Sequence, residues 1–291
     1  MPPFAETVTV RVAGRLGMAF FLDILRIACD GHQLLDGLIL LTIGHANVEY
    51  LERDAAMQAR FADYDDVPDD DLLRPISISA VANSLGQPFE TIRRRTAALR
   101  EAGACATTGK GLIIPPAELG SDRHKVITFA INQKVRALEA ALEALGLLRP
   151  HGAGVTDPRV VARLAIQCCL RQLEAMTAHI EDPTVGVLLI HVIRATTEHL
   201  DDTHTELSET EDLMSDDLRR PAPVSLLTAR VGLPPETVRR HLGRLHQRGW
   251  IARSSTGYYL TRDMLRAPPW PQARRDNVVN LNRLFAGLGR T

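Results

Sequence analysis

The sequence lacks the residues from which a disulfide framework, a cysteine metal motif or a membrane span is built. Its 291 residues include only four cysteines, and no two of them have the C-x-x-C spacing. No apolar run approaches the roughly 18 residues needed to cross a bilayer. The apolar stretch that begins at Met18 is broken by Asp23, and no small-residue cleavage site follows, so no signal peptide is expected. These absences predict a cytoplasmic chain with structural cysteines and no membrane contact.

Catalytic and cofactor motifs are absent as well. The chain contains no phosphate-binding glycine loop, no nucleophile elbow and no H-E-x-x-H motif, so neither an enzyme nor a cofactor is expected. The residues that could be imagined as a metal site or sensor are His191, Glu198, His199 and His204. His191 lies in an apolar segment, however, and Glu198 and His199 lie at its polar end. This placement favours structural or surface roles, and no metal is expected.

What the sequence does contain is an internal repeat. Residues 71–119 match residues 217–265 without a gap at an offset of 146. Of the 49 aligned pairs, 16 are identical, whereas about three would be expected by chance at ordinary residue frequencies. Residues 37–51 also find a match, at an offset of 149. The chain is therefore predicted to consist of two units, 1–149 and 150–291, and we call the two gap-free segments the first and second reading blocks.

Helical periodicity covers most of each unit outside its reading block. The expected helices lie at about 14–30, 34–58 and 121–146 in the first unit and at about 157–180, 184–202 and 275–288 in the second. Residues 38–43 and 187–193 are apolar almost all round, which favours a buried helix over a short strand. Buried helices outside the reading blocks suit packing between the two units.

Each reading block has the pattern of a helix, a short turn, a second helix and a hairpin. The turns are Gly86-Gln87-Pro88 and Gly232-Leu233-Pro234, and the second helices cover about 89–102 and 235–248. This order is the plan of a winged helix-turn-helix. We therefore predict a mainly α fold with small β-wings, in which two tandem winged helix-turn-helix units with flanking helices form a pseudo-symmetric intramolecular dimer.

The residues that open the second helices resemble those of bacterial transcription regulators. Leu85 to Arg94 and Val231 to Arg240 are similar to the recognition-helix region of the GntR type, with its Thr-Val-Arg-Arg start and Leu-x-x-x-Gly end. The order of the surrounding helices is more similar to the MarR type. Neither family usually carries two such units in one chain. The resemblance implies a winged-helix fold and a DNA-reading role, but no particular effector or target.

The helical repeat of 100° per residue places a set of polar side chains on the outer face of each second helix. Arginine can bond guanine at two atoms or clamp phosphate, and threonine can do either. Basic residues in the hairpins suit contact with a phosphate backbone. The candidate DNA-binding residues are Glu90, Thr91, Arg93, Arg94, Lys110, Glu236, Thr237, Arg239, Arg240, Arg244 and Arg253. Arg95 and His241 project closer to the core edge.

The charge distribution supports a polyanionic partner, although the net charge of −1 hides it. Residues 74–112 hold six basic and two acidic side chains, a net of +4, and residues 220–262 hold eight basic and one acidic, a net of +7. The compensating acidic residues crowd the connections at 63–71 and 206–217. These connections are expected to be solvated loops, with competition against DNA for the basic surface as the alternative.

Double-stranded DNA is therefore the expected partner, with a role in transcription regulation near the nucleoid. The main alternative is a tandem winged-helix scaffold similar to chromosome-segregation proteins of the ScpB type, in which the wings contact protein. The near-neutral isoelectric point of 6.8 is compatible with this alternative, and the duplicated arginines weigh against it. A small-molecule effector between the buried helices and the reading blocks is conceivable, but no residue set identifies one. The assembly is expected to be a monomeric pseudo-dimer or a homodimer.

Overall fold

The computed structural model describes residues 7–148, 154–180, 182–200, 213 and 215–289. In the first half the elements are α1 Thr7–Cys29, α2 Leu34–Val48, η1 Glu49–Arg53, α3 Ala55–Arg60, η2 Asp70–Leu72, α4 Ile78–Ser84, α5 Phe89–Glu101, β1 Ala106–Thr108, β2 Gly111–Ile113, α6 Pro116–Leu119 and α7 Asp122–Ala144. In the second half they are α8 Pro158–Thr177, α9 Pro183–Ala195, η3 Asp216–Leu218, α10 Val224–Val231, α11 Pro235–Gln247, β3 Ala252–Arg253, β4 Tyr258–Tyr259, α12 Arg262–Arg266 and α13 Trp270–Gly287. The chain is thus mainly helical, and the described part has two small antiparallel strand pairs, as expected.

Side-chain caps fix several helix starts. Ser77 Oγ accepts a hydrogen bond from Ala80 N at the start of α4, and Ser121 Oγ accepts one from His124 N at the start of α7. Asp182 Oδ1 accepts from Thr184 N at the start of α9. Each cap satisfies a backbone N–H that has no partner within the helix. The local sequence therefore sets these boundaries before any long-range packing is considered.

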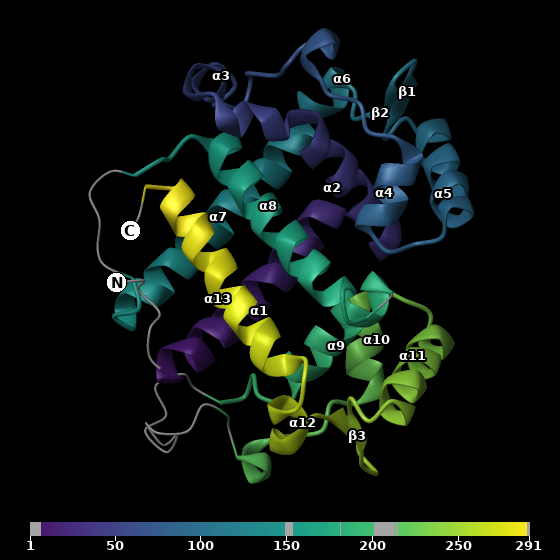
Figure 1. The fold of residues 1–291 in the computed structure, drawn as a ribbon, viewed down its shortest axis with the longest axis vertical. Coiled ribbons are helices and arrows are strands. Elements are labelled where there is room, and N and C mark those ends of the chain that lie inside the picture. The colour runs from purple at the N-terminus through teal and green to yellow at the C-terminus, as the bar shows by residue number, and fades with distance from the viewer. Residues whose placement is uncertain (1–6, 149–153, 181, 201–212, 214, 290–291) are drawn as a thin grey trace.

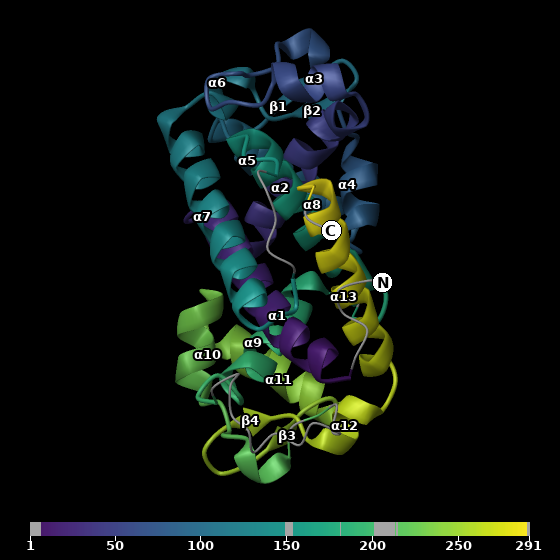
Figure 2. The same ribbon diagram turned by 90° about the vertical axis from the view of Figure 1, so that its left-hand side faces the viewer.

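Four long helices form the centre of the molecule, and two come from each half. Helix α1 packs against α7 in the first half, as α8 packs against α13 in the second. Between the halves, α7 packs against α8 and α13 packs against α1. Figures 1 and 2 show these helices running between the two ends of the molecule. Helix α1 is thus equivalent to α8, and α7 is equivalent to α13. Equivalent helices have equivalent neighbours in the two halves.

The contact between α1 and α13 is close because α1 carries a glycine at the crossing point. A Cβ built on Gly17 would lie 2.7 Å from Asn277 Nδ2 and 3.1 Å from Leu281 Cδ1. The largest hydrophobic core accordingly mixes side chains from both halves, such as Phe21 of α1, Ile131 of α7, Ala165 of α8 and Phe285 of α13. Residue 150 separates two sequence repeats, but it does not separate two hydrophobic cores.

The reading blocks occupy opposite ends of the long axis (Figure 1). The first block shares the central core, to which it adds Val81, Ile92 and Leu99. The second block has a hydrophobic cluster of its own with α9, built from residues such as Leu188, Val238 and Leu242. Residues 38–43 and 187–193 are helical and mostly buried, as the sequence predicts.

Backbone relationships recur at the spacing of the sequence repeat. Arg74 N donates to Asn47 O over 3.0 Å, and 146 residues later Arg220 N donates to Thr196 O over 3.0 Å. The hairpins have the same register, since Ala106 pairs with Ile113 and Ala252 pairs with Tyr259. The repeat is therefore visible in hydrogen bonding as well as in residue identity.

Two predicted helices end earlier than expected. The helix expected at 34–58 breaks into α2, a 3₁₀ turn and α3, because Asp54 caps a new helix by accepting from Ala56 N and Met57 N. The helix expected at 184–202 ends at Ala195, where the buried Thr196 follows. The main contacts between the halves are made by α1, α7, α8 and α13, whereas the sequence pointed to α2 and α9. No helix in the described ranges is long and apolar enough to cross a membrane.

Candidate nucleic-acid interface

Helix α5 is held to the first half by one apolar face. Ile92, Thr96 and Leu99 are buried at helical spacing, as predicted, and the Thr96 hydroxyl returns its hydrogen bond to Ile92 O at 2.9 Å. The turn before α5 requires Gly86, whose φ of +60° lies in the left-handed region. Helix α11 repeats this arrangement with Val238, Leu242 and Leu245 buried and with Gly232 at a φ of +68°. The opposite face of each helix is left to solvent.

That outer face carries the predicted candidates. In α5, Glu90, Arg93 and Arg94 are exposed and Thr91 is half-buried. The exposed candidates of α11 are Glu236, Arg239, Arg240 and Arg244, and Thr237 is half-buried. The solvent-facing side of both helices is therefore the one that the helical periodicity predicts.

One arginine in each helix is paired with a glutamate one turn earlier. Arg93 donates to Glu90 through Nε at 2.8 Å and Nη2 at 2.6 Å, and its hydrogen bonds hold the pKa of the Glu90 carboxyl below its usual range. The equivalent pair, Arg239 and Glu236, has a single contact of 3.3 Å. For Arg93 and Arg239, the local ion pair that is usual on a solvated helix face is present.

The neighbouring arginines behave differently. Arg94, Arg240 and Arg244 are exposed and form no ion pair with any residue that the structure describes. Each guanidinium can therefore approach an external anion without first breaking an internal contact. Arg94 and Arg240 are equivalent positions of the repeat, whereas Arg244 has Ala98 as its counterpart.

Arg95 and His241 lie at the edge of the core, as the sequence indicated. Arg95 Nη1 donates to Asp36 Oδ1 at 2.8 Å. His241 is buried, and burial lowers the pKa of its imidazole. The negative charge of Asp182, at the start of α9, opposes that shift. Neither side chain belongs to the outer face.

The hairpins place one basic candidate each in solvent. Lys110 is exposed at the β1–β2 turn, and Arg253 is exposed in β3 with its guanidinium carbon 5.9 Å from the ring centroid of Tyr258. Tyr258 is buried and Tyr259 is half-buried, which confirms that one of the two tyrosines belongs to the hairpin core. Each hairpin is tied back to its block by a bridge, Ile76 to Leu112 in the first and Ala222 to Tyr258 in the second.

Helices α5 and α11 lie along the same edge of the molecule. Figure 1 shows both at the right-hand side, one near each end of the long axis, with a hairpin beside each. The central helices hold the two blocks apart. One straight, extended partner could therefore contact both helices at once.

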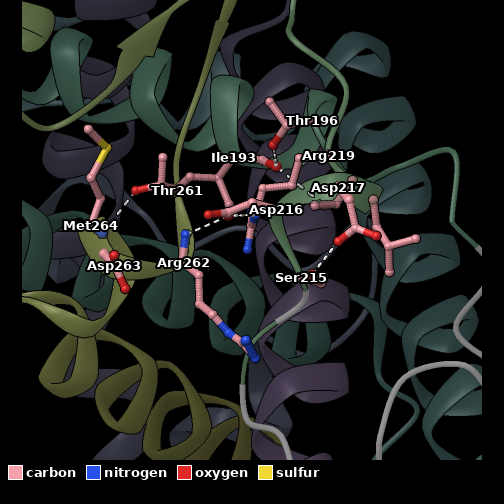
Figure 3. A network of polar contacts seen from close by, with 12 residues as sticks. Ile193, Thr196, Ser215, Asp216, Asp217, Arg219, Thr261, Arg262, Asp263 and Met264 are labelled. Carbon is pink, nitrogen blue, oxygen red and sulfur yellow. Dashed lines mark hydrogen bonds and ion pairs between the residues drawn. The ribbon is translucent and has the colours of Figure 1, made fainter.

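The acidic connections are partly used within the fold. In the first connection, Lys125 pairs with Asp65. At the end of the second, Asp216 Oδ1 accepts from Arg219 Nε at 3.1 Å and from Arg262 N at 2.6 Å (Figure 3). The same figure shows Ser215 bonded to Asp217, and Thr261 capping α12 through Met264 N at 3.2 Å. Residues 206, 209, 211 and 212, which carry most of the acidic side chains of the second connection, lie outside the described residues.

Among the described residues, the histidines near α9 do not lie around a common point. Glu198 is bound by Arg230 at 2.6 and 2.9 Å, and His199 Nε2 lies 3.0 Å from Leu218 O. Within the described ranges no group of three or more histidine, cysteine, aspartate or glutamate side chains could hold a metal ion. His204 lies outside those ranges.

Comparisons of the chain with protein-family models, curated proteins and solved structures found no match.

Proposed function

We propose that the protein binds double-stranded DNA through α5 and α11 and regulates transcription, each helix acting as the recognition helix of a winged helix-turn-helix. The observation that carries the proposal is the position of Arg94 and Arg240. Both are exposed, both lack an ion-pair partner among the described residues, and both lie on equivalent helices along one edge of the molecule.

The proposed contact follows from the dimensions of a duplex. The major groove admits an α-helix, and guanine presents two acceptors there that match the two-pronged guanidinium. Thr91 and Thr237 add hydroxyl groups close to the start of each helix, and Lys110 and Arg253 add positive charge in the hairpins. A hairpin beside a groove-bound helix meets the adjacent phosphate backbone.

Two recognition helices in one chain replace the symmetric dimer that most paired sites require. The pairing of α1 with α13 and of α7 with α8 supports the inference that the chain acts as a pseudo-symmetric dimer within one polypeptide. We infer that it binds an imperfect repeat whose half-sites have their centres about one helical turn, roughly 10 base pairs, apart. The half-sites need not be identical, because Arg244 in α11 has no basic counterpart in α5.

Binding measurements with matched arginine variants test the proposal. A duplex selected by the protein from a random pool is labelled, and fluorescence anisotropy is recorded at moderate salt for the parent chain, Arg94→Ala and Arg240→Ala. Arg136→Ala is the control, since Arg136 is an exposed arginine on α7 outside both reading blocks. Each recognition-helix variant should weaken binding by about tenfold, which corresponds to the loss of one specific arginine–base contact.

Footprinting adds a geometric test of the same proposal. The parent chain should protect two short segments on one face of the duplex, and each variant should lose one of them. DNA binding would be contradicted if the purified protein did not bind duplexes even at low salt. It would also be contradicted if Arg136→Ala weakened binding as much as Arg94→Ala and Arg240→Ala do. In that case the scaffold alternative becomes the stronger explanation of the exposed helices.

A further inference from the structure

Two cavities occupy equivalent places in the two halves. The first, of about 160 Å³, lies among α2, α7 and α8, and the second, of about 120 Å³, lies among α9, α13 and α1. Leu41 and Leu119 line the first cavity, and their repeat counterparts Ile190 and Leu265 line the second. Each cavity is lined in part by a helix from the other half of the chain. The two cavities are therefore duplicated features, like the reading blocks.

The wall of the first cavity is mainly apolar. Leu40, Leu41, Ile127, Ile131 and Ile166 contribute to it, and Gly44 leaves room on the α2 side. This lining explains why Leu40 and Leu41 are only half-buried although the surrounding α2 residues are buried. An apolar body of suitable size would be well accommodated by these side chains.

One cation in this wall has two nitrogen atoms without a hydrogen-bond partner among the described residues. Arg163 of α8 lines the cavity and donates through Nη1 to Phe61 O at 2.8 Å. Its Nε and Nη2 atoms are buried and have no partner among the described residues. Burial lowers the pKa of the guanidinium to about 10, and the charge of Glu52 partly offsets this shift. Glu52 does not line the cavity and forms no ion pair with Arg163 within the described part of the chain.

Three other polar side chains of the cavity, Arg159, His124 and His45, offer no second unpaired cation, and two carboxylates, Asp30 and Glu118, also line it. Arg159 donates to Asp63 O, Tyr64 O and Leu119 O, at 2.7 to 2.9 Å. Burial lowers the pKa of His124 to about 4, so its imidazole is uncharged at neutral pH. Burial likewise lowers the pKa of His45. Leaving two buried guanidinium donors unpaired costs free energy, and an anionic acceptor would remove that cost.

The second cavity differs at the decisive position. Arg15 of α1 stands there where Arg163 of α8 stands in the first cavity, and its Nη2 donates to Thr197 O at 3.3 Å and to Leu200 O at 2.8 Å. Two backbone carbonyls thus accept from the Arg15 guanidinium, whereas one, Phe61 O, accepts from Arg163. The duplication has thus produced two cavities. In the first one, two buried guanidinium nitrogens of Arg163 still lack an acceptor within the described residues.

We propose that the first cavity is a binding site for one small organic monoanion per chain, with an apolar body among the α2 and α7 side chains and a carboxylate on Arg163. The volume sets the size of the ligand, because an apolar cavity of about 150 Å³ accepts a molecule of the size of benzene. Ala104 and Ile114, which flank the β1–β2 hairpin, also line the cavity. A bound ligand would therefore touch the segments that carry the first hairpin.

Calorimetric titration with benzoate tests the site independently of any DNA binding. Benzamide is the neutral probe of the same shape. The variants are Arg163→Met, which removes the cation, and Gly44→Leu, which fills the cavity and leaves Arg163 in place. A Cβ on Gly44 would lie 3.5 Å from Ile114 Cγ1, an ordinary contact, so the backbone tolerates the change. Arg136→Met on the surface of α7 is the control.

The expected result is saturable binding of benzoate at one molecule per chain, with benzamide at least tenfold weaker. Arg163→Met and Gly44→Leu should each weaken benzoate binding at least tenfold, and Arg136→Met should not change it. Three results would overturn the proposal. They are no saturable binding to the parent chain at up to about 10 mM benzoate, equal affinity for benzamide, and unchanged benzoate affinity in Arg163→Met.

Discussion

Arg95 Nη1 lies 2.8 Å from Asp36 Oδ1, and this ion pair joins the middle of α5 to the N-terminal end of α2. Both side chains are less than a third exposed, so solvent screens the pair only in part. In the second half the imidazole of His241 faces the charge of Asp182 from the equivalent place on α11. Helix α5 is thus fixed to the start of α2 by an ion pair, whereas the equivalent position on α11 holds a buried histidine whose pKa is lowered by burial.

Breaking this contact should destabilise the first reading block. We expect Asp36→Ala to lower the free energy of unfolding by about 1–3 kcal/mol, because the half-buried guanidinium of Arg95 loses its partner. Asp69→Ala, at an exposed aspartate, should have little effect. Urea denaturation of Asp36→Ala, Arg95→Leu and the double variant Asp36→Ala/Arg95→Leu gives the coupling energy. A coupling energy of zero would show that the pair does not hold α5.

Releasing Arg93 should strengthen non-specific DNA binding. In Glu90→Gln the helix loses a negative charge and Arg93 loses its bidentate partner. Affinity for a random duplex should rise, and the salt dependence should become steeper by about one unit as one more phosphate contact forms. Anisotropy titrations at several salt concentrations measure both effects. Glu101→Gln, at the far end of α5, tests whether the loss of any acidic charge would do the same.

Each hairpin contains one glycine position that should not tolerate a side chain. A Cβ on Gly111 would lie 2.6 Å from Ile76 O, and a Cβ on Gly257 would lie 2.3 Å from Ala222 O. Gly111→Ala should therefore cost about 2 kcal/mol of stability, since backbone must move to relieve the clash. Gly109→Ala is the matched control, because nothing lies within 4 Å of its Cβ position. Equal melting temperatures for the two variants would contradict this account of the hairpin.

Local signals in the sequence were enough to predict the reading blocks. Gly86 and Gly232 mark the turns, and the spacing of Ile92, Thr96 and Leu99 identifies the buried face of α5. These features depend on residues within one or two helical turns. The exposure of Arg94 and Arg240 follows from the same periodicity, which is why the outer face could be assigned without coordinates.

The long-range features could not be predicted in the same way. Asn47 lies in an apolar stretch, yet it is fully buried because its side chain bonds Arg74 O, Leu112 O and Ile114 N. Its partners lie 27 to 67 residues away, and no local pattern identifies them. The Arg163 nitrogens that lack a hydrogen-bond partner among the described residues likewise result from the packing of α2, α7 and α8. Amphipathic helices all present similar faces, so the sequence did not show which helices cross between the halves.

Stability should fall as the pH decreases from 6.5 to 4. Burial lowers the pKa of His124 and of His191 to about 4 in the folded protein, whereas an unfolded histidine titrates near 6.5. Between these values the unfolded chain binds protons that the folded chain does not, so the free energy of unfolding falls with decreasing pH, by up to about 3 kcal/mol for each histidine. Denaturation curves recorded across this range give the free energy of unfolding at each pH. This free energy should change less with pH for His124→Gln than for the exposed control His179→Gln. Identical pH profiles would contradict the assignment.

The thiols should be inert in the folded protein. All four cysteines are buried and free, and burial raises the pKa of Cys29 and Cys168 to about 12 and that of Cys105 to about 11. Because the thiolate is the reactive form, a disulfide reagent should modify none of them rapidly at neutral pH and all four in guanidinium. Cys105, between α5 and β1, should react first, and Cys105→Ser should remove that phase. Rapid modification of the folded chain would show that a core helix opens readily.

The shared bundle of α1, α7, α8 and α13 has a consequence for how a paired target would be occupied. Regulators that assemble from separate subunits must first reach the concentration at which they associate. For a chain that binds DNA through α5 and α11 as proposed, the second contact is intramolecular from the outset, and its effective concentration is set by the fold. Occupancy should therefore rise with the first power of protein concentration, and dilution should not uncouple one half-site from the other. The covalent link also allows each half to acquire its own base preference. A target with two different half-sites could then orient the molecule in one direction along the duplex.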